Sequence, residues 1–207
     1  MKDNKIYIVF SSTNTKIGKI IRFITKNQYN HISISLDKKI KEMYSFARYY
    51  RNMPLVGGFV TESALRYISN TNEIKTKICE LTLTDKQYAD VLNYINSIKC
   101  SNDYIYNTLS ATLSPLQKDY TIHRSFTCLS FVNELLNTIG YTKKKLYTIR
   151  DAEQLLNDKI IYEGNMLDVI EAYEWGEDNY YEKKGIIKVI RYTIGHFKSL
   201  IYRLIKY

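Results

Sequence analysis

The segment 125–140, SFTCLSFVNELLNTIG, places a cysteine where a helix is expected to begin. Ser125 or Thr127 can cap the helix, and apolar residues follow at helical spacing until Gly140 ends it. Cys128 therefore lies in the first turn, near the positive end of the helix dipole and beside backbone N–H groups that lack helical acceptors. Both features favour a thiolate, and the N–H groups can bind the oxyanion of a tetrahedral intermediate. The pattern indicates a nucleophile that attacks a carbonyl group.

The other two cysteines lie in less reactive contexts. Cys79 shares one face of an expected strand with Leu81 and Leu83, which is typical of a small core residue. Cys100 follows an expected helix that ends near residue 99, and nothing close to it in the sequence supplies a base. Three cysteines without a CxxC pair exclude a disulfide scaffold and offer no half of a zinc site. We expect reduced thiols and neither a metal nor another cofactor.

A cysteine nucleophile needs a base, and the chain contains three histidines. His196 lies in a basic C-terminal segment, which favours a surface or packing role. His123 lies only five residues before Cys128, but in an expected loop. His31 begins the alternating strand HISISL, 31–36, on a polar face that it shares with two small serines. His31 is thus the best-placed candidate, and the local pattern fits a structural histidine equally well.

The elements that must position these residues can be read along the chain. Composition and periodicity predict strands over 5–10, 31–36, 41–48 and 75–84, and helices over 15–25 and 84–99 besides the cysteine helix. Thr84 and Gln87 form the capping box of the second of these helices. Residues 101–124 are expected to be mostly loop with one short helix. Together these elements predict an α+β domain in which an antiparallel sheet packs against helices.

Length and composition are those of a packed globular chain. The 207 residues are 45% hydrophobic and 25% charged with only two prolines, which excludes collagen-like, low-complexity and disordered classes. The apolar run 6–10 is too short for a secretory signal, and no uncharged stretch approaches the roughly 20 residues that span a bilayer. We expect a cytoplasmic protein, with peripheral attachment to a membrane as the alternative.

The net charge of +9 is concentrated at the two ends of the chain. Residues 1–60 contain 11 basic and 3 acidic residues, residues 61–180 contain 12 and 17, and residues 181–207 contain 7 and 1. A basic surface fits anionic lipid, nucleic acid or an acidic substrate. Nucleic acid is the least supported of these partners, because the 20 tyrosines form no recognisable binding motif.

The segment 186–207, IIKVIRYTIGHFKSLIYRLIKY, has the pattern of an amphipathic helix. Its apolar stripe consists of Ile187, Ile190, Ile194, Phe197, Ile201 and Leu204, with lysine and arginine on the other faces. This pattern predicts a helical extension, 181–207, docked on a domain that comprises 1–180. The alternative is an interfacial helix that binds an anionic membrane. Gly195 is expected to weaken or kink the helix.

The motifs YNHISISL, 29–36, and FTCLSFVNELL, 126–136, resemble those of the circularly permuted papain-like cysteine hydrolases. These are the permuted relatives of the NlpC-type cell-wall peptidases, and include the YaeF/YiiX-like proteins and the lecithin:retinol acyltransferase-like enzymes. In the unpermuted enzymes the cysteine helix comes first, whereas here the histidine strand precedes it by about a hundred residues. The resemblance covers roughly residues 5–140.

The resemblance implies that Cys128 is the nucleophile that forms a thioester, and that His31 takes its proton and later activates water or another acceptor. The family places a third polar residue on the next strand to orient the imidazole, and matching the strands puts Ser45 there. Serine departs from the usual His, Glu, Asn or Gln. A three-residue hairpin loop would set Ser45 opposite His31, and a loop of two or four residues would bring Glu42 to that face. Glu62 is a second carboxylate that could reach the imidazole.

The activity that the resemblance implies is hydrolysis of an amide bond, as in an amidase or thiol peptidase, on a small molecule or peptide. Two alternatives remain open. One is ester cleavage or acyl transfer on lipids at an anionic membrane, which the basic ends of the chain favour. The other is a non-catalytic binding protein with a decayed papain-like site, which the weak third residue favours.

Overall fold

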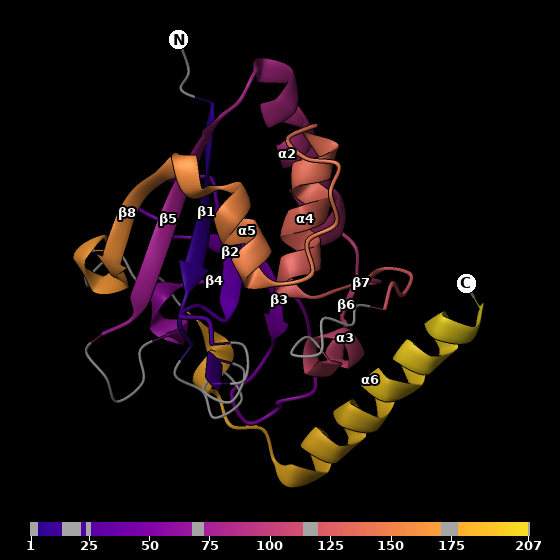
Figure 1. Ribbon diagram of the computed structural model, residues 1–207. Coiled ribbons are helices and arrows are strands. Elements are labelled where there is room, and N and C mark those ends of the chain that lie inside the picture. The colour runs from indigo at the N-terminus through magenta and orange to yellow at the C-terminus, as the bar shows by residue number, and fades with distance from the viewer. Residues whose placement is uncertain are drawn as a thin grey trace.

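The computed structural model describes residues 4–13, 22–23, 26–67, 73–113, 120–170 and 178–206. In these residues the chain forms an α+β fold with one eight-stranded, mostly antiparallel sheet and five α-helices (Figure 1). The prediction of an α+β fold with an antiparallel sheet against helices is confirmed at this level. The helix predicted over 15–25 lies largely outside the described residues.

The sheet has the strand order β7-β6-β4-β3-β2-β1-β5-β8. Its strands are β1 Lys5–Ser11, β2 His31–Ser35, β3 Met43–Arg48, β4 Gly57–Glu62, β5 Lys75–Thr82, β6 Ile105–Tyr106, β7 Ser125–Phe126 and β8 Ile160–Asn165. Only the short pair β6 and β7 is parallel. All four predicted strands form, because each has the β-branched and aromatic content that a half-buried pleated surface selects.

The α-helices are α2 Asp85–Lys99, α3 Thr108–Leu113, α4 Cys128–Thr138, α5 Ile149–Leu155 and α6 Ile186–Lys206. The capping box predicted at Thr84 and Gln87 is present at the start of α2. Gly140 has a φ of 70°, the left-handed conformation that ends α4 as predicted. No element was predicted between Gly140 and the C-terminal helix, where the structure forms α5 and β8.

The sheet is covered on both faces. The main core lies between the sheet and the helices α2 and α4, and contains Ile8, Phe10, Ile32, Ile34, Phe46, Val91, Ile95, Phe131 and Leu135. A smaller cluster on the other face contains Tyr7, Val9, Met43, Tyr67, Ile78 and Met166. Neighbouring residues of β1 belong alternately to the two clusters. This alternation is expected of a strand that is buried on both faces, because successive side chains point to opposite sides of the sheet.

The C-terminal helix α6 lies beside α3 at the edge of the molecule (Figure 1). It is continuous through Gly195. Only His196 and Leu200 of this helix are buried, whereas the predicted apolar stripe remains exposed, with Ile187 at 80%. The helix therefore contacts the domain through a narrow strip beside its apolar stripe. In the described part of the chain, no helix is long and apolar enough to cross a membrane.

Candidate active site

Cys128 is the first residue of α4, and the short strand β7 leads directly to it. Thr127 caps the helix: its Oγ1 accepts from the Ser130 N–H at 3.1 Å, and Ser130 Oγ accepts from the Thr127 N–H at 2.8 Å. This reciprocal pair fixes the turn that carries the thiol. Within the described residues, the backbone N–H groups of Cys128 and Leu129 have no acceptor, as expected for the first turn of a helix. Two donors are thus available beside the half-buried sulfur.

His31 is the first residue of β2, where it pairs with Ser11 of β1. The side chain is buried, and its Nε2 lies 3.0 Å from Glu62 Oε1. The Cys128 thiol lies near the same ring, close enough to help raise the pKa of His31. Because Glu62 engages Nε2, Nδ1 is the ring nitrogen left to face the thiol. The imidazole thus lies between a carboxylate that it contacts and a thiol nearby.

Glu62, the last residue of β4, is 1% exposed and both of its carboxylate oxygens are occupied. Ser45 Oγ donates to Oε1, the same oxygen that faces His31. The Tyr67 hydroxyl donates to Oε2. These two donors hold the carboxylate in place, because a buried charge is costly unless it is hydrogen-bonded and paired.

The charges of the pair follow from burial and from the partners. Burial alone would lower the pKa of His31, but the charges of Glu62 and Cys128 and the hydrogen bonds to both raise that pKa to about 10. Burial would raise the pKa of Glu62, but His31, Arg66 and the Ser45 hydroxyl outweigh it and lower that pKa to about 2. At neutral pH the pair is therefore an imidazolium and a carboxylate.

The structure brings two of the three predicted catalytic residues near each other and places the third one step away. Cys128 lies close enough to His31 to raise its pKa, whereas Ser45 contacts Glu62. Glu62, which the sequence left as a rival to Ser45, is the group bonded to the imidazole. The other rival, Glu42, instead accepts a hydrogen bond of 3.0 Å from the Tyr44 hydroxyl.

The hairpin register explains the place of Ser45. Ile34 pairs with Tyr44, so the continued register sets Ser45 opposite Ser33 rather than His31. Neither register considered from the sequence is correct, because the connection between the strands is longer than a tight turn. Its residue Ile40 has a φ of 47° and is fully buried in the smaller core, which ties the connection to the sheet.

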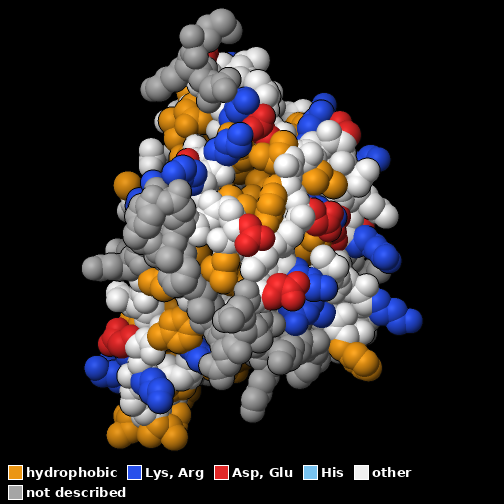
Figure 2. Space-filling model, turned by 90° about the vertical axis from the view of Figure 1, so that its left-hand side faces the viewer, with side chains coloured by type: hydrophobic (Ala, Val, Ile, Leu, Met, Phe, Trp, Pro, Cys, Tyr) orange, Lys and Arg blue, Asp and Glu red, His pale blue; other side chains and the backbone are white. Residues whose placement is uncertain are grey.

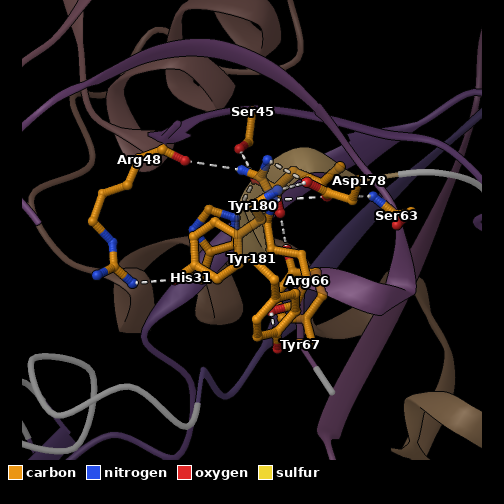
Figure 3. A network of polar contacts seen from close by, with 10 residues as sticks. His31, Ser45, Arg48, Ser63, Arg66, Tyr67, Asp178, Tyr180 and Tyr181 are labelled. Carbon is orange, nitrogen blue, oxygen red and sulfur yellow. Dashed lines mark hydrogen bonds and ion pairs between the residues drawn. The ribbon is translucent and has the colours of Figure 1, made fainter. Parts of the chain in front are cut away.

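A segment distant in sequence covers the Glu62 side of the site. We call residues 178–184 the C-terminal strap. Arg66 donates to both oxygens of Asp178, from Nε at 2.9 Å and from Nη2 at 3.0 Å. Its guanidinium also lies 4.9 Å from the ring centre of the buried Tyr180, whose hydroxyl accepts from Arg48 Nη2 at 2.6 Å. Figure 3 shows these side chains gathered around His31 and Tyr67.

Four residues around Glu62 were not predicted from the sequence as part of the site: Tyr67, Arg66, Asp178 and Tyr180. Arg66 and Asp178 are 112 residues apart, and no local pattern links them. Tyr180 is one of 20 tyrosines, most of them without a distinguishing context. Tyr67 follows the short helix η1 Ala64–Arg66, and its distance of five residues from Glu62 is the only signal that could have indicated their contact.

The remaining histidines and cysteines lie in other settings. His196 Nε2 is 3.0 Å from Thr108 Oγ1, and burial lowers the pKa of this histidine. His123 is exposed in the loop before β7. Cys79 is fully buried, and burial raises its pKa to about 12, whereas Cys100 is exposed after α2. Within the part of the chain that the structure describes, no three His, Cys, Asp or Glu side chains gather as metal ligands.

Comparisons of the chain with protein-family models, with curated proteins and with solved structures found no match. Function must therefore be inferred from the residues and their geometry. The geometry defines a class of site, in which a carboxylate orients an imidazole that lies near a thiol at a helix start.

Proposed function

We propose that the protein is a cysteine hydrolase that uses Cys128, His31 and Glu62 as a catalytic triad. The observation that carries the proposal is the buried contact of Glu62 with the His31 imidazole, beside which the Cys128 thiol lies at the start of α4. The order of histidine strand and cysteine helix, and the α+β fold, agree with a permuted papain-like enzyme. The sulfur attacks the substrate, the imidazole carries the proton, and Glu62 orients the ring.

The first half of the reaction follows from the charge state of the site. A positive charge beside a cysteine sulfur favours the thiolate, and His31 is an imidazolium at neutral pH. The sulfur attacks the carbonyl carbon of an amide, and the N–H groups of Cys128 and Leu129 bind the resulting oxyanion. The C–N bond then breaks, the imidazolium gives its proton to the departing amine, and a thioester remains on Cys128.

The second half regenerates the enzyme. Neutral His31 takes a proton from water, and the resulting hydroxide oxygen attacks the thioester carbon. The C–S bond breaks, the sulfur leaves as a thiolate and the carboxylic acid product departs. Glu62 stabilises the imidazolium that re-forms at this stage, as the acidic member of a triad does.

The Glu62 carboxylate argues against the alternative of a binding protein with a decayed catalytic site. That alternative rested on Ser45, a weak orienting residue in the third position of the triad. Glu62 provides a charged residue that contacts the ring, and Ser45 becomes a positioning residue that holds the carboxylate. A complete triad favours an active enzyme over a binding protein.

A lipid ester is the second candidate substrate, for hydrolysis or for acyl transfer. The specific observation in its favour is α6, whose apolar side chains are exposed next to basic ones. This helix contacts the loop before β7, the strand that leads to Cys128. Arg203 Nη1 donates at 3.2 Å to the carbonyl oxygen of His123, five residues before the cysteine. The chemistry at Cys128 is the same for an amide and for an ester.

Alkylation by iodoacetamide tests the nucleophile before any substrate is known. We expect the reagent to modify Cys128 faster than a free thiol below about pH 8, as is typical of a thiolate next to a cation. Exposed Cys100 and buried Cys79 are internal controls in the same chain. Equal rates at Cys128 and Cys100, or an inert Cys128, would contradict the proposal and favour the decayed site. Hydrolysis found in a later substrate screen should be lost in Cys128→Ala with the melting temperature nearly unchanged.

A further inference from the structure

The helix α6 exposes an apolar face that no described part of the chain covers. Seven aliphatic side chains on it are at least half exposed: Ile186, Ile187, Ile190, Ile194, Ile201, Leu204 and Ile205. They recur at steps that keep them on one side of the helix. Figure 2 is turned about the vertical axis from Figure 1, so heights agree in the two views. The hydrophobic patch at the bottom of Figure 2 lies at the height where α6 begins in Figure 1. Apolar surface of this extent on a folded chain marks an interaction site.

Basic residues flank this apolar face. The helix contains Lys188, Arg191, Lys198, Arg203 and Lys206 and no aspartate or glutamate. At 3.6 residues per turn, Arg191 and Lys198 lie next to the apolar face on the side away from the domain, and both are exposed. The surface is therefore apolar along its centre and positive along one side, which is the pattern of helices that lie in a membrane interface.

Contacts on a different side hold α6 to the domain and keep the apolar face outward. His196 bonds Thr108, and Leu200 is buried one turn further along. Near the end of the helix, Arg203 Nη1 donates to the carbonyl oxygen of His123 at 3.2 Å. Before its start, Asn52 Nδ2 donates to the Lys184 carbonyl oxygen at 2.7 Å. The apolar face is thus presented on an anchored helix.

We infer that α6 is an interfacial helix that binds membranes containing anionic lipid. The apolar side chains enter the boundary between headgroups and acyl chains, and the basic residues contact the negative headgroups. Charge complementarity favours this occupant over a second copy of the chain. Two such helices packed face to face would bring together the basic residues that border the apolar face, Arg191 and Lys198 of each copy, with no acidic residue on either helix. The inference does not depend on the chemistry of Cys128.

Vesicle sedimentation of the full-length protein tests the inference. Vesicles of phosphatidylcholine alone are compared with vesicles that also contain phosphatidylserine, each in low and in high salt. We expect the protein to sediment with the anionic vesicles and to be released by salt, because the headgroup contacts are screened. The paired substitution R191Q/K198Q should lower the partition coefficient about thirtyfold, from two basic residues near the surface. The matched control K143Q/K144Q removes the same charge from exposed loop residues and should bind as the wild type does.

A second variant tests the apolar face. I190N/I194N changes two side chains that are more than half exposed, so we expect its melting temperature to stay within a few degrees of the wild type. We also expect it to lose binding to anionic vesicles. Equal binding of the wild type to neutral and anionic vesicles, or no binding to either, overturns the inference. A dimer in solution that I190N/I194N disrupts, together with no vesicle binding, assigns the face to a second copy. If I190N/I194N does not fold, the vesicle series with the wild type and R191Q/K198Q decides.

Discussion

The ring of His31 lies between a carboxylate and a thiol, and its charge depends on both. Buried without them, an imidazole would be neutral at physiological pH. Glu62 and Cys128 reverse this and raise the pKa of His31 to about 10. Ser45 and Tyr67 each donate to Glu62 and so keep the carboxylate ionised and fixed. The reactivity of one sulfur therefore depends on residues from β2, β3, β4 and α4.

Glu62→Gln should reduce the alkylation rate of Cys128 at neutral pH by about tenfold or more. A tenfold change corresponds to a shift of about one unit in the pKa of the neighbouring His31 imidazole. The substitution keeps the shape of the side chain but removes the charge that keeps His31 protonated. Ser45→Ala is the comparison, because it leaves the charge of Glu62 in place and should have a smaller effect. The measurement is the alkylation rate of Cys128 by mass spectrometry across pH. The same loss in both variants would mean that Glu62 acts only through packing.

The His31–Glu62 pair should also make stability depend on pH in a defined window. The pKa of His31 is raised from 6.5 to about 10, so its contribution is complete below 6.5 and is lost as the pH rises to 10. The pKa of Glu62 is lowered from 4.5 to about 2, so its contribution is complete above 4.5 and is lost as the pH falls to 2.

Glu62→Ala should therefore lower the free energy of unfolding most between pH 4.5 and 6.5. Leaving a buried partner uncompensated costs about 3–5 kcal/mol. Urea unfolding of the variant and the wild type at about pH 3, 5.5 and 9 measures the difference, which should be smaller at both extremes. A difference that does not change with pH would show that the pair is neutral in the folded protein.

Local signals predicted the elements that carry the thiol and much less of what surrounds it. The helices α2 and α4 were predictable because capping side chains and apolar spacing lie within a few residues of each other. The hairpin register was not, because the connection that carries the buried side chain of Ile40 is longer than a tight turn. Glu62 could be named only as a rival, since a contact across 31 residues depends on how three strands pair. The short α5 and the edge strand β8 lack a sustained period.

The cap of α4 should contribute to reactivity as well as to stability. Thr127→Ala removes the acceptor for the Ser130 N–H and should cost about 1 kcal/mol. For a chain of this length that lowers the melting temperature by about 2–4 °C. It should also slow the alkylation of Cys128, because the turn that positions the sulfur loosens.

Thr84→Ala is the matched control for this prediction. It breaks the same kind of capping box at α2, where the Thr84 and Gln87 side chains bond reciprocally with the backbone. We expect a similar loss in melting temperature and no change in the alkylation of Cys128. Equal slowing in both variants would attribute the effect to general destabilisation rather than to the position of the thiol.

At the scale of the whole molecule, the C-terminal strap joins the catalytic site to α6. Asp178 pairs with Arg66, the last residue of η1, and η1 begins directly after Glu62 and its neighbour Ser63. Tyr180 contributes its carbonyl oxygen to the Arg51 N–H at 2.7 Å and its ring to Arg48 and Arg66. The strap therefore packs against the rest of the described chain through Asp178 and Tyr180, which both lie within the predicted 1–180 domain. No sequence pattern predicted this, because the ion pair joins residues that are distant in the chain.

Two shortened chains should separate the strap from the helix. A chain that ends at residue 184 keeps Asp178 and Tyr180 and loses only α6. Its main loss is the burial of Leu200, about 1.5–3 kcal/mol. A chain that ends at residue 177 also leaves Arg66 without its partner in a largely buried position, at a further cost of about 3–5 kcal/mol. Asp178 holds Arg66 in place, and the Arg66 charge helps to keep the pKa of Glu62 low, so only the shorter chain should also slow the alkylation of Cys128. Urea unfolding and alkylation of both chains measure the two effects, and equal stability would show that the strap is not part of the domain.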